Sequence, residues 1–234
     1  MNTDIIYNRD CLEGLKELPD NCIDLVIADP PYYFGENFKG ADSFGHRQNY
    51  RDIEELNEPL NYEVLEECLR VLKAPNLYIW TNKTQLGAYI SFFESKGCKT
   101  DLLTWHKRNP TPATSNNYLS DTEYCLFFRK GAPLYGTYDT KKKYWITATN
   151  QKEKAKYDHP TIKPLSIIKQ LIINSTQGGG LVIDPYMGSG TTALACKMLG
   201  RHYIGFEIEP KYCELASKRL KDVSGLDAWF TGGA

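Results

Sequence analysis

The sequence lacks the cysteine and histidine patterns of disulfide scaffolds and zinc sites. Its seven cysteines are an odd number, they are scattered, and no two of them form a CxxC pair. The four histidines have no spacing typical of zinc ligands. We therefore expect reduced cysteines, a cytoplasmic protein and no bound metal.

Long hydrophobic runs are also absent. No apolar stretch approaches the roughly 18 residues that a membrane-spanning helix needs. The first ten residues, MNTDIIYNRD, lack the basic and then apolar run of a secretory signal. These absences predict a protein with no membrane partner.

An excess of charge of one sign is missing as well. The formal net charge is -1 and the sequence pI is about 6.4, so a nucleic acid would have to be held by a local basic surface. The length of 234 residues suits one α/β domain with its own core and is short for two. We expect a single domain over residues 1–234.

Short apolar runs typical of buried strands alternate along the chain with amphipathic runs of helical spacing. Strand-like runs include 22–31, 76–80 and 180–186, and helix-like runs include 11–19, 62–74 and 165–175. This alternation predicts an α/β, Rossmann-like fold in which helices cover both faces of a mostly parallel sheet. A polar segment spans 131–158, and the tail 225–234 carries no helix or strand signal.

The segment DPYMGSGTT, residues 184–192, joins a strand-like run to a helix start through a glycine-rich turn. Such a turn aims backbone N–H groups at a nucleotide-like ligand, and Gly188 and Gly190 permit close approach. Glu207, at the end of the next strand, suits two ribose hydroxyls. Asp184 would repel a pyrophosphate but suits the cationic end of S-adenosylmethionine. This motif alone leaves a nicotinamide-dependent oxidoreductase open, whereas the missing Gly-Lys-Ser/Thr excludes a P-loop.

The segment DPPY, residues 29–32, follows another buried strand. An exocyclic amino group of adenine or cytosine is a poor nucleophile, because its lone pair is delocalised into the ring. The Asp29 carboxylate and the Pro30 carbonyl can accept hydrogen bonds from that group and aim its lone pair at a methyl donor. Pro30 and Pro31 stiffen the segment, and Tyr32 suits stacking on a flipped base.

Three motifs in this order, DPPY at 29–32, HPTIKP at 159–164 and DPYMGSGTT at 184–192, resemble the beta class of amino-methylating DNA methyltransferases. The resemblance covers nearly the whole chain. It implies one S-adenosylmethionine-dependent methyltransferase fold with circularly permuted motif order, the catalytic motif preceding the cofactor motif. It also implies that the catalytic residues are Asp29, Pro30, Pro31 and Tyr32.

The resemblance further implies a set of cofactor-binding residues. Within that set, Asp10 matches the acid at the adenine of the cofactor, and Thr161 and Lys163 match the segment at the methionine end. The full set is Asp10, Thr161, Lys163, Asp184, Pro185, Tyr186, Gly188, Gly190, Thr191 and Glu207. Tyr186 replaces the usual phenylalanine and keeps an aromatic ring. Pro164 before an amphipathic run also fits a simple helix start, which is the alternative interpretation of 159–164.

In the beta class, target recognition lies between the last core strands and the HPTIKP segment. Here that leaves a short insert, 131–158, in which lysines alternate with aromatic residues, a composition suited to phosphate contacts and stacking. Candidate DNA-binding residues there and in two loops are Lys39, Arg47, Arg51, Lys107, Asn109, Lys141, Lys142 and Lys143. A solvated charged loop is the alternative.

The resemblance implies methyl transfer from S-adenosylmethionine to N6 of a flipped adenine in double-stranded DNA. Adenine is favoured because the catalytic motif begins with Asp29, where cytosine-N4 enzymes more often have serine. Cytosine-N4 methylation, RNA methylation and a non-catalytic DNA-binding module remain alternatives. Because the insert is short, a homodimer is a further expectation. A cognate restriction endonuclease is another.

Overall fold

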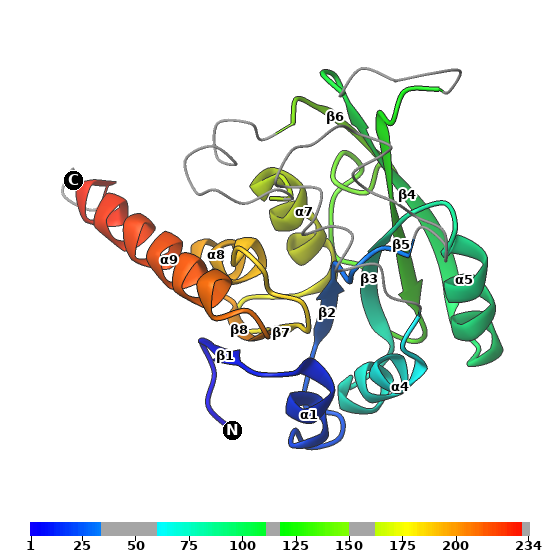
Figure 1. The fold of residues 1–234 in the computed structure, drawn as a ribbon, viewed down its shortest axis with the longest axis horizontal. Coiled ribbons are helices and arrows are strands. Elements are labelled where there is room, and N and C mark those ends of the chain that lie inside the picture. Colours follow the sequence, from blue (N-terminus) through cyan, green and yellow to red (C-terminus); the bar gives the residue numbers. More distant parts are fainter. Residues whose placement is uncertain (34–59, 111–117, 150–161, 231–234) are drawn as a thin grey trace.

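The computed structural model describes residues 1–33, 60–110, 118–149 and 162–230, with side chains described as far as Asp222. Within these residues one sheet has the strand order β1-β8-β7-β2-β3-β5-β4-β6 (Figure 1). The strands are β1 (Ile5–Asn8), β2 (Leu25–Ala28), β3 (Asn76–Thr81), β4 (Lys99–Lys107), β5 (Thr122–Arg129), β6 (Tyr144–Thr147), β7 (Leu181–Asp184) and β8 (His202–Glu207). Strand β5 is antiparallel to both neighbours, and every other pairing is parallel.

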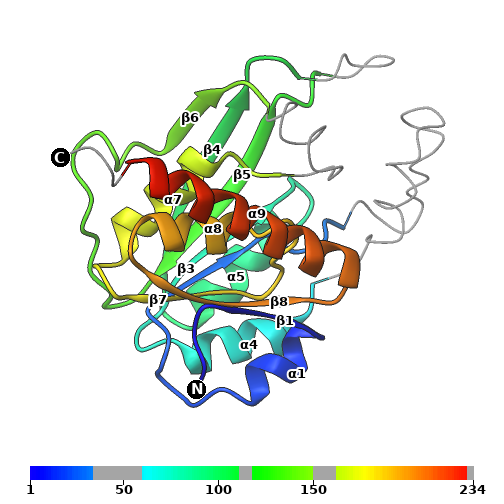
Figure 2. The same ribbon diagram turned by 90° about the vertical axis from the view of Figure 1, so that its left-hand side faces the viewer.

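Helices cover both faces of the sheet. They are α1 (Cys11–Lys16), α4 (Tyr62–Val71), α5 (Leu86–Ser95), α7 (Leu165–Ser175), α8 (Thr191–Met198) and α9 (Pro210–Phe230). Helices α1, α4 and α5 pack in one core cluster, and α7 and α8 pack in the other. Figure 2 shows α9 along α8, at the side of the sheet formed by β1 and β8. The predicted α/β architecture with a mostly parallel sheet is confirmed.

Burial on both faces explains why the central strands have continuous apolar runs. All four residues of β2 are buried, with Leu25 and Ile27 in the α7–α8 core and Val26 and Ala28 in the opposite core. Strand β7 is likewise buried throughout. Parallel strands covered by helices on both sides need apolar residues at every position, not at alternate ones.

The structure differs from the sequence prediction in two segments. Strand β6 lies inside the polar insert, where only Trp145 of its four residues is buried. Its residues, YWIT, are aromatic or β-branched and favour a strand, and the segment pairs in parallel with β4. Helix α9 continues to Phe230, through most of the tail expected to be irregular. Extending an existing helix costs little, because each added residue brings its own hydrogen bond.

None of the described helices is both long enough and apolar enough to cross a membrane.

Candidate active site

Four carboxylates lie at the carboxyl ends of four neighbouring parallel strands. Asp10 follows β1, Glu207 ends β8, Asp184 ends β7 and Asp29 follows β2. Strands β2 and β7 pair directly, so the strand ends that carry Asp29 and Asp184 are neighbours. In open parallel sheets this edge is where ligands bind. Residues far apart in the sequence are thereby gathered at one edge.

The Asp29 carboxylate is held through both of its oxygens. Lys163 Nζ donates to Oδ2 at 2.5 Å, and the Tyr32 hydroxyl donates to Oδ1 at 3.0 Å. Burial raises the pKa of Asp29 above its usual range, and the Lys163 ammonium offsets part of that rise. The carboxylate is therefore oriented before any substrate is present.

The side chain of Lys163 is buried between two acids and two aromatic rings. Its side chain is 9% exposed, and Nζ also lies 3.4 Å from Glu123 Oε2. The same nitrogen is 5.1 Å from the ring centre of Trp80 and 5.6 Å from that of Tyr32. Burial lowers the pKa of Lys163, but the attraction of Asp29 and Glu123 outweighs it and leaves the pKa raised. Lys163 is therefore protonated in this environment.

The HPTIKP segment is only partly described. Thr161 lies outside the described residues, so its predicted place at the methionine end stays a prediction. The ammonium of Lys163, expected near the cofactor carboxylate, is bound in this structure to the carboxylate of Asp29. Helix α7 begins directly after this segment, with Pro164 at its N-cap, as the helix-start interpretation expects.

The backbone after DPPY is anchored to the connection between β3 and α5. The Tyr33 N–H donates to the side-chain oxygen of Gln85 at 3.1 Å, and the Tyr33 carbonyl accepts from Asn82 Nδ2 at 2.7 Å. These two bonds hold the segment through its backbone, leaving the side chain of Tyr32 to contact Asp29. The predicted stacking of Tyr32 on a flipped base stays a prediction.

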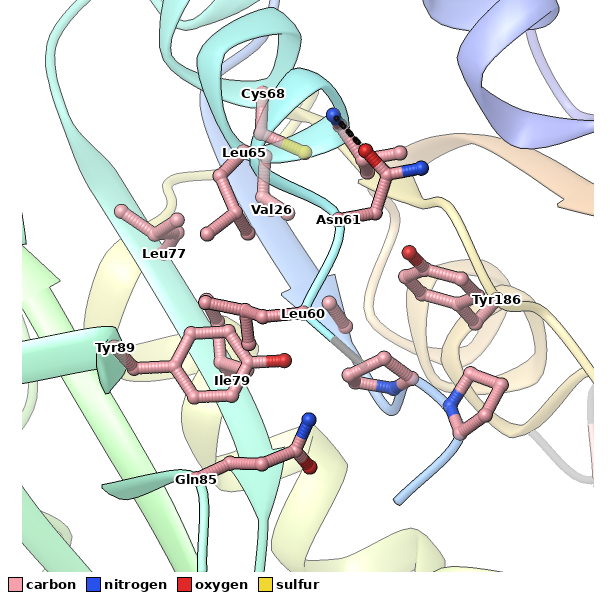
Figure 3. A pocket seen from close by; sticks show the side chains of 14 residues that line it. Val26, Leu60, Asn61, Leu65, Cys68, Leu77, Ile79, Gln85, Tyr89 and Tyr186 are labelled. Atoms are coloured by element: carbon pink, nitrogen blue, oxygen red, sulfur yellow. Dashed lines mark hydrogen bonds between the residues drawn. The ribbon is translucent and has the colours of Figure 1, made fainter. Parts of the chain in front are cut away.

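A narrow cavity adjoins Pro30 and Pro31 on the α4 side of the sheet (Figure 3). Gln85 and Tyr89 lie along one side of it, and Tyr186 lies on the other. Its volume of about 30 Å³ is room for roughly two water molecules. As outlined by the described residues, this cavity is too small for a nucleobase or a nucleoside cofactor.

The glycine-rich turn needs its glycines. Gly188 and Gly190 have φ values of 51° and 78°, in the left-handed region that other residues rarely adopt. A Cβ on Gly190 would lie 2.7 Å from the Cβ of Ala216 in α9. The Gly188 N–H donates to Glu207 Oε2 at 2.8 Å, which fixes the turn to the end of β8.

Asp184 is a structural part of the same turn. Its Oδ1 accepts from the Tyr186 N–H at 3.0 Å, and its Oδ2 accepts from the Thr192 hydroxyl at 2.6 Å. These bonds clamp Pro185 and the turn between β7 and α8. Burial raises the pKa of Asp184 to about 7, although both hydrogen bonds act in the opposite direction.

Arg219 of α9 hydrogen-bonds to the glycine-rich turn and is not among the residues predicted from the sequence. The residue is 2% exposed. Its Nη1 donates to the Ser189 carbonyl at 2.6 Å, the Ser189 hydroxyl at 3.0 Å and the Thr191 hydroxyl at 3.0 Å. The available sequence signal was weak: Arg219 lies three residues after the small Ala216, on the same face of the helix.

The residues at this edge suit S-adenosylmethionine. Helix α8 begins after Gly190 without a side-chain cap, so its first N–H groups face a turn that carries no bulky side chain at Gly188 or Gly190. The half-buried Glu207 offers a carboxylate at the end of β8, and Asp10 offers a second acid at the end of β1. Acceptors for hydroxyl and amino groups beside a glycine-rich turn match an adenosine-containing ligand.

The predicted DNA-binding residues are spread over two regions of the described chain and a third outside it. Lys107 and Asn109 lie at the carboxyl end of β4, where Lys107 Nζ is 2.7 Å from Glu123 Oε1 and Asn109 accepts from the Thr149 N–H. Outside the described residues are Lys39, Arg47 and Arg51.

The lysines before β6 lie beside an earlier part of β4. Lys142 pairs with Asp139 and Lys143 with Asp101, and the Lys143 carbonyl accepts from the Thr104 N–H. The structure does not bring Lys141, Lys142 and Lys143 together with Lys107. Phosphate binding by all these residues stays a prediction.

Comparison with known proteins identifies the same family as the motifs. The profile of the N6/N4 methyltransferase family, described as DNA methylase, matches residues 23–218. The Type II methyltransferase M2.MboI of Moraxella bovis is 32% identical, over 94% of this chain and 88% of that protein. M2.DpnII of Streptococcus pneumoniae is 31% identical, over 94% of this chain and 90% of that protein.

Solved structures agree. The complex of M1.HpyAVI with S-adenosylmethionine has a TM-score of 0.68 and 28% identity, covering 92% of this chain and 98% of that one. The cytosine-N4-specific PvuII DNA methyltransferase has a TM-score of 0.70 at 17% identity, over 92% of this chain and 85% of that one, a likeness in fold alone. With DPPY and the glycine-rich turn on neighbouring strands, this chain belongs to the amino-methylating DNA methylase family, whose methyl donor is S-adenosylmethionine.

Proposed function

We propose that the protein transfers the methyl group of S-adenosylmethionine to N6 of adenine in double-stranded DNA. The observation that carries this proposal is the oriented carboxylate of Asp29 on the strand next to the glycine-rich turn. An aspartate at this position, where cytosine-N4 enzymes more often have serine, supports adenine as the base.

In the proposed reaction, Asp29 and the Pro30 carbonyl accept hydrogen bonds from the adenine amino group. This concentrates the lone pair on nitrogen, and S-adenosylmethionine supplies an electrophilic methyl group. As the new N–C bond forms, the bond between the methyl carbon and the sulfonium sulfur breaks and S-adenosylhomocysteine leaves. The base nitrogen is then positively charged and must lose one proton. Because burial raises the pKa of Asp29, its carboxylate suits accepting that proton. Pro31 restricts the backbone of the segment, and the Tyr32 hydroxyl keeps the carboxylate oriented.

We also propose roles for the residues around the cofactor. Glu207 binds the ribose hydroxyls and Asp10 the adenine amino group, since Glu207 ends β8, the strand next to β7, and Asp10 follows β1, the strand beyond β8. Asp184, with its oxygens used inside the turn, acts on the cofactor through the shape of the turn and through its charge. Thr161 completes the site at the methionine end.

The domain organisation, the DNA-contacting segment and the partners are also proposed. We propose one methyltransferase domain over residues 1–234, with 131–158 as a short target-recognition insert that contacts DNA. A recognition insert of this size favours a homodimer that doubles the DNA-contacting surface. Relatives named Type II methyltransferases support a cytoplasmic restriction-modification role beside a cognate endonuclease.

The test is a product analysis with a matched variant. The purified protein is incubated with isotopically labelled S-adenosylmethionine and separate double-stranded DNA and RNA mixtures, which are then digested for mass spectrometry of the nucleosides. We expect N6-methyladenine in DNA from the wild type and from Asp20→Ala, which alters an exposed acid that pairs with Arg70 outside the site, and none from Asp29→Ala. N4-methylcytosine would overturn the choice of base, and label in RNA alone would overturn the choice of substrate.

A further inference from the structure

One buried ammonium lies between two carboxylates that come from different strands. Lys163 Nζ is 2.5 Å from Asp29 Oδ2 and 3.4 Å from Glu123 Oε2. Glu123 is in β5, which pairs with β3, and β3 in turn pairs with β2, the strand that leads to Asp29. The ring of Trp80 in β3 lies beside the ammonium between these two strands.

This arrangement poses a problem for the target base. In the proposed reaction the amino group must donate to Asp29, where it competes with the bonds that Lys163 and Tyr32 already donate, one to each oxygen. If Lys163 gave up its bond to Asp29 with no other partner, a buried charge would lose its compensation. Breaking a buried ion pair from one side is strongly unfavourable.

Glu123 supplies the second partner that such a rearrangement needs. Its side chain is 20% exposed, and its other oxygen, Oε1, is 2.7 Å from Lys107 Nζ. The charges therefore alternate in the order Asp29, Lys163, Glu123, Lys107. A small shift of the Lys163 ammonium from Asp29 toward Glu123 leaves each of these four charges next to a charge of opposite sign.

We propose, building on the methyl-transfer function above, that Glu123 is a positioning residue that takes over the Lys163 ammonium when the target amino group binds Asp29. Asp29 then accepts from the base, while Lys163 stays close enough to favour the ionised carboxylate. Lys107 holds Glu123 in place through its ion pair with Oε1, the other carboxylate oxygen of Glu123. No covalent bond is made or broken in this step. It affects how the target base is positioned against Asp29 and how quickly that position is reached.

The decisive measurement compares the pH dependence of kcat in Glu123→Gln and Lys163→Met. The negative charge of Glu123 raises the pKa of Asp29 and the positive charge of Lys163 lowers it, so the acid limb should move to lower pH in Glu123→Gln and to higher pH in Lys163→Met. The other ionisable groups around Asp29 are unchanged in both variants: Tyr32, Tyr89, Cys125 and Asp184.

At neutral pH we expect Glu123→Gln to lower kcat about tenfold, since Lys163 then has Asp29 as its remaining carboxylate. The KM for S-adenosylmethionine should stay unchanged. Glu123→Asp keeps the charge and should recover part of the lost rate. Glu67→Gln is the matched control, because Glu67 is 19% exposed and pairs with Arg70 at 2.7 Å, outside the site.

The opposite shifts separate a positioning role from a purely structural one. A structural role would lower kcat or the unfolding temperature in both variants without moving the acid limbs in opposite directions, and that result would overturn the inference. Wild-type kcat and an unmoved pH profile in Glu123→Gln would overturn it as well. In either case N6-methyladenine formed by the wild type would leave the proposed function standing.

Discussion

The ammonium of Lys163 lies 2.5 Å from the Oδ2 atom of Asp29, although the two residues are 134 positions apart in the sequence. Asp29 follows β2, and Lys163 immediately precedes the N-cap of α7, a helix that packs in the core shared by β2 and β3. The docking of α7 therefore decides what charge faces the proposed catalytic carboxylate.

Replacing Lys163 by methionine removes that charge while keeping much of the side-chain volume. The pKa of Asp29 should then rise, so the carboxyl group stays protonated to higher pH and activity is lost at a higher pH than in the wild type. We expect kcat at neutral pH to fall at least about tenfold. The measurement is kcat against pH, with Lys73→Met as control, since Lys73 pairs with Asp24 outside the site. An acid limb that stayed in place would show that Lys163 does not act on Asp29.

Replacing Arg219 by methionine should weaken S-adenosylmethionine binding about tenfold, because the Ser189 carbonyl and the Thr191 hydroxyl each lose a buried donor. Isothermal titration calorimetry measures the Kd, and DNA binding should change little. Lys218→Met alters the exposed neighbour on α9 and serves as control. If both variants bound the cofactor like the wild type, Arg219 would have no part in shaping the turn.

Asp184 should make stability depend on pH. Its pKa is about 7 in the folded protein and about 3.9 in an unfolded chain, so between these values the folded state binds more protons. The free energy of unfolding contributed by this group is therefore highest below about pH 4 and falls as pH rises toward 7, by about 1.4 kcal/mol per unit at most.

Urea unfolding of Asp184→Asn across this pH range tests the assignment. The variant should lack the part of the slope that Asp184 contributes, whereas Asp20→Asn, which alters an exposed acid, should keep it. Parallel pH dependences in wild type and Asp184→Asn would contradict the raised pKa of Asp184.

Gly190→Ala should destabilise the protein by about 1–3 kcal/mol, because the residue has a φ of 78° and its new Cβ would press on Ala216. Since the turn borders the proposed cofactor site, S-adenosylmethionine binding should weaken in the same variant. Gly178→Ala is the control, with no atom within 4 Å of the added Cβ, and should change stability by no more than about 0.5 kcal/mol. Equal stability of the two variants would show that the turn relaxes without cost.

Local patterns were sufficient for most of the fold. The runs around Leu25–Ala28 and Leu181–Asp184 predicted buried strands, whereas the direct pairing of those two strands is a finding of the structure. The pattern failed at β6, where three of four residues are not buried, and at the end of α9. The β6 residues favour a strand but lie within a lysine-rich polar segment, and pairing with β4 completes the strand. At the end of α9, extension of an existing helix supplied the order.

By itself the sequence determined the chemistry at the strand ends: a carboxylate and two prolines in DPPY, a glycine-rich turn, and an acid at Glu207. Turn types and periodic burial depend on neighbours within a few residues, so they can be read along the chain. Only the tertiary structure decided that Lys163 pairs with Asp29, that Glu123 also lies close to the Lys163 ammonium and that Arg219 hydrogen-bonds to the turn. Those contacts depend on which strands are adjacent and where α7 and α9 pack, and no local pattern contains that information.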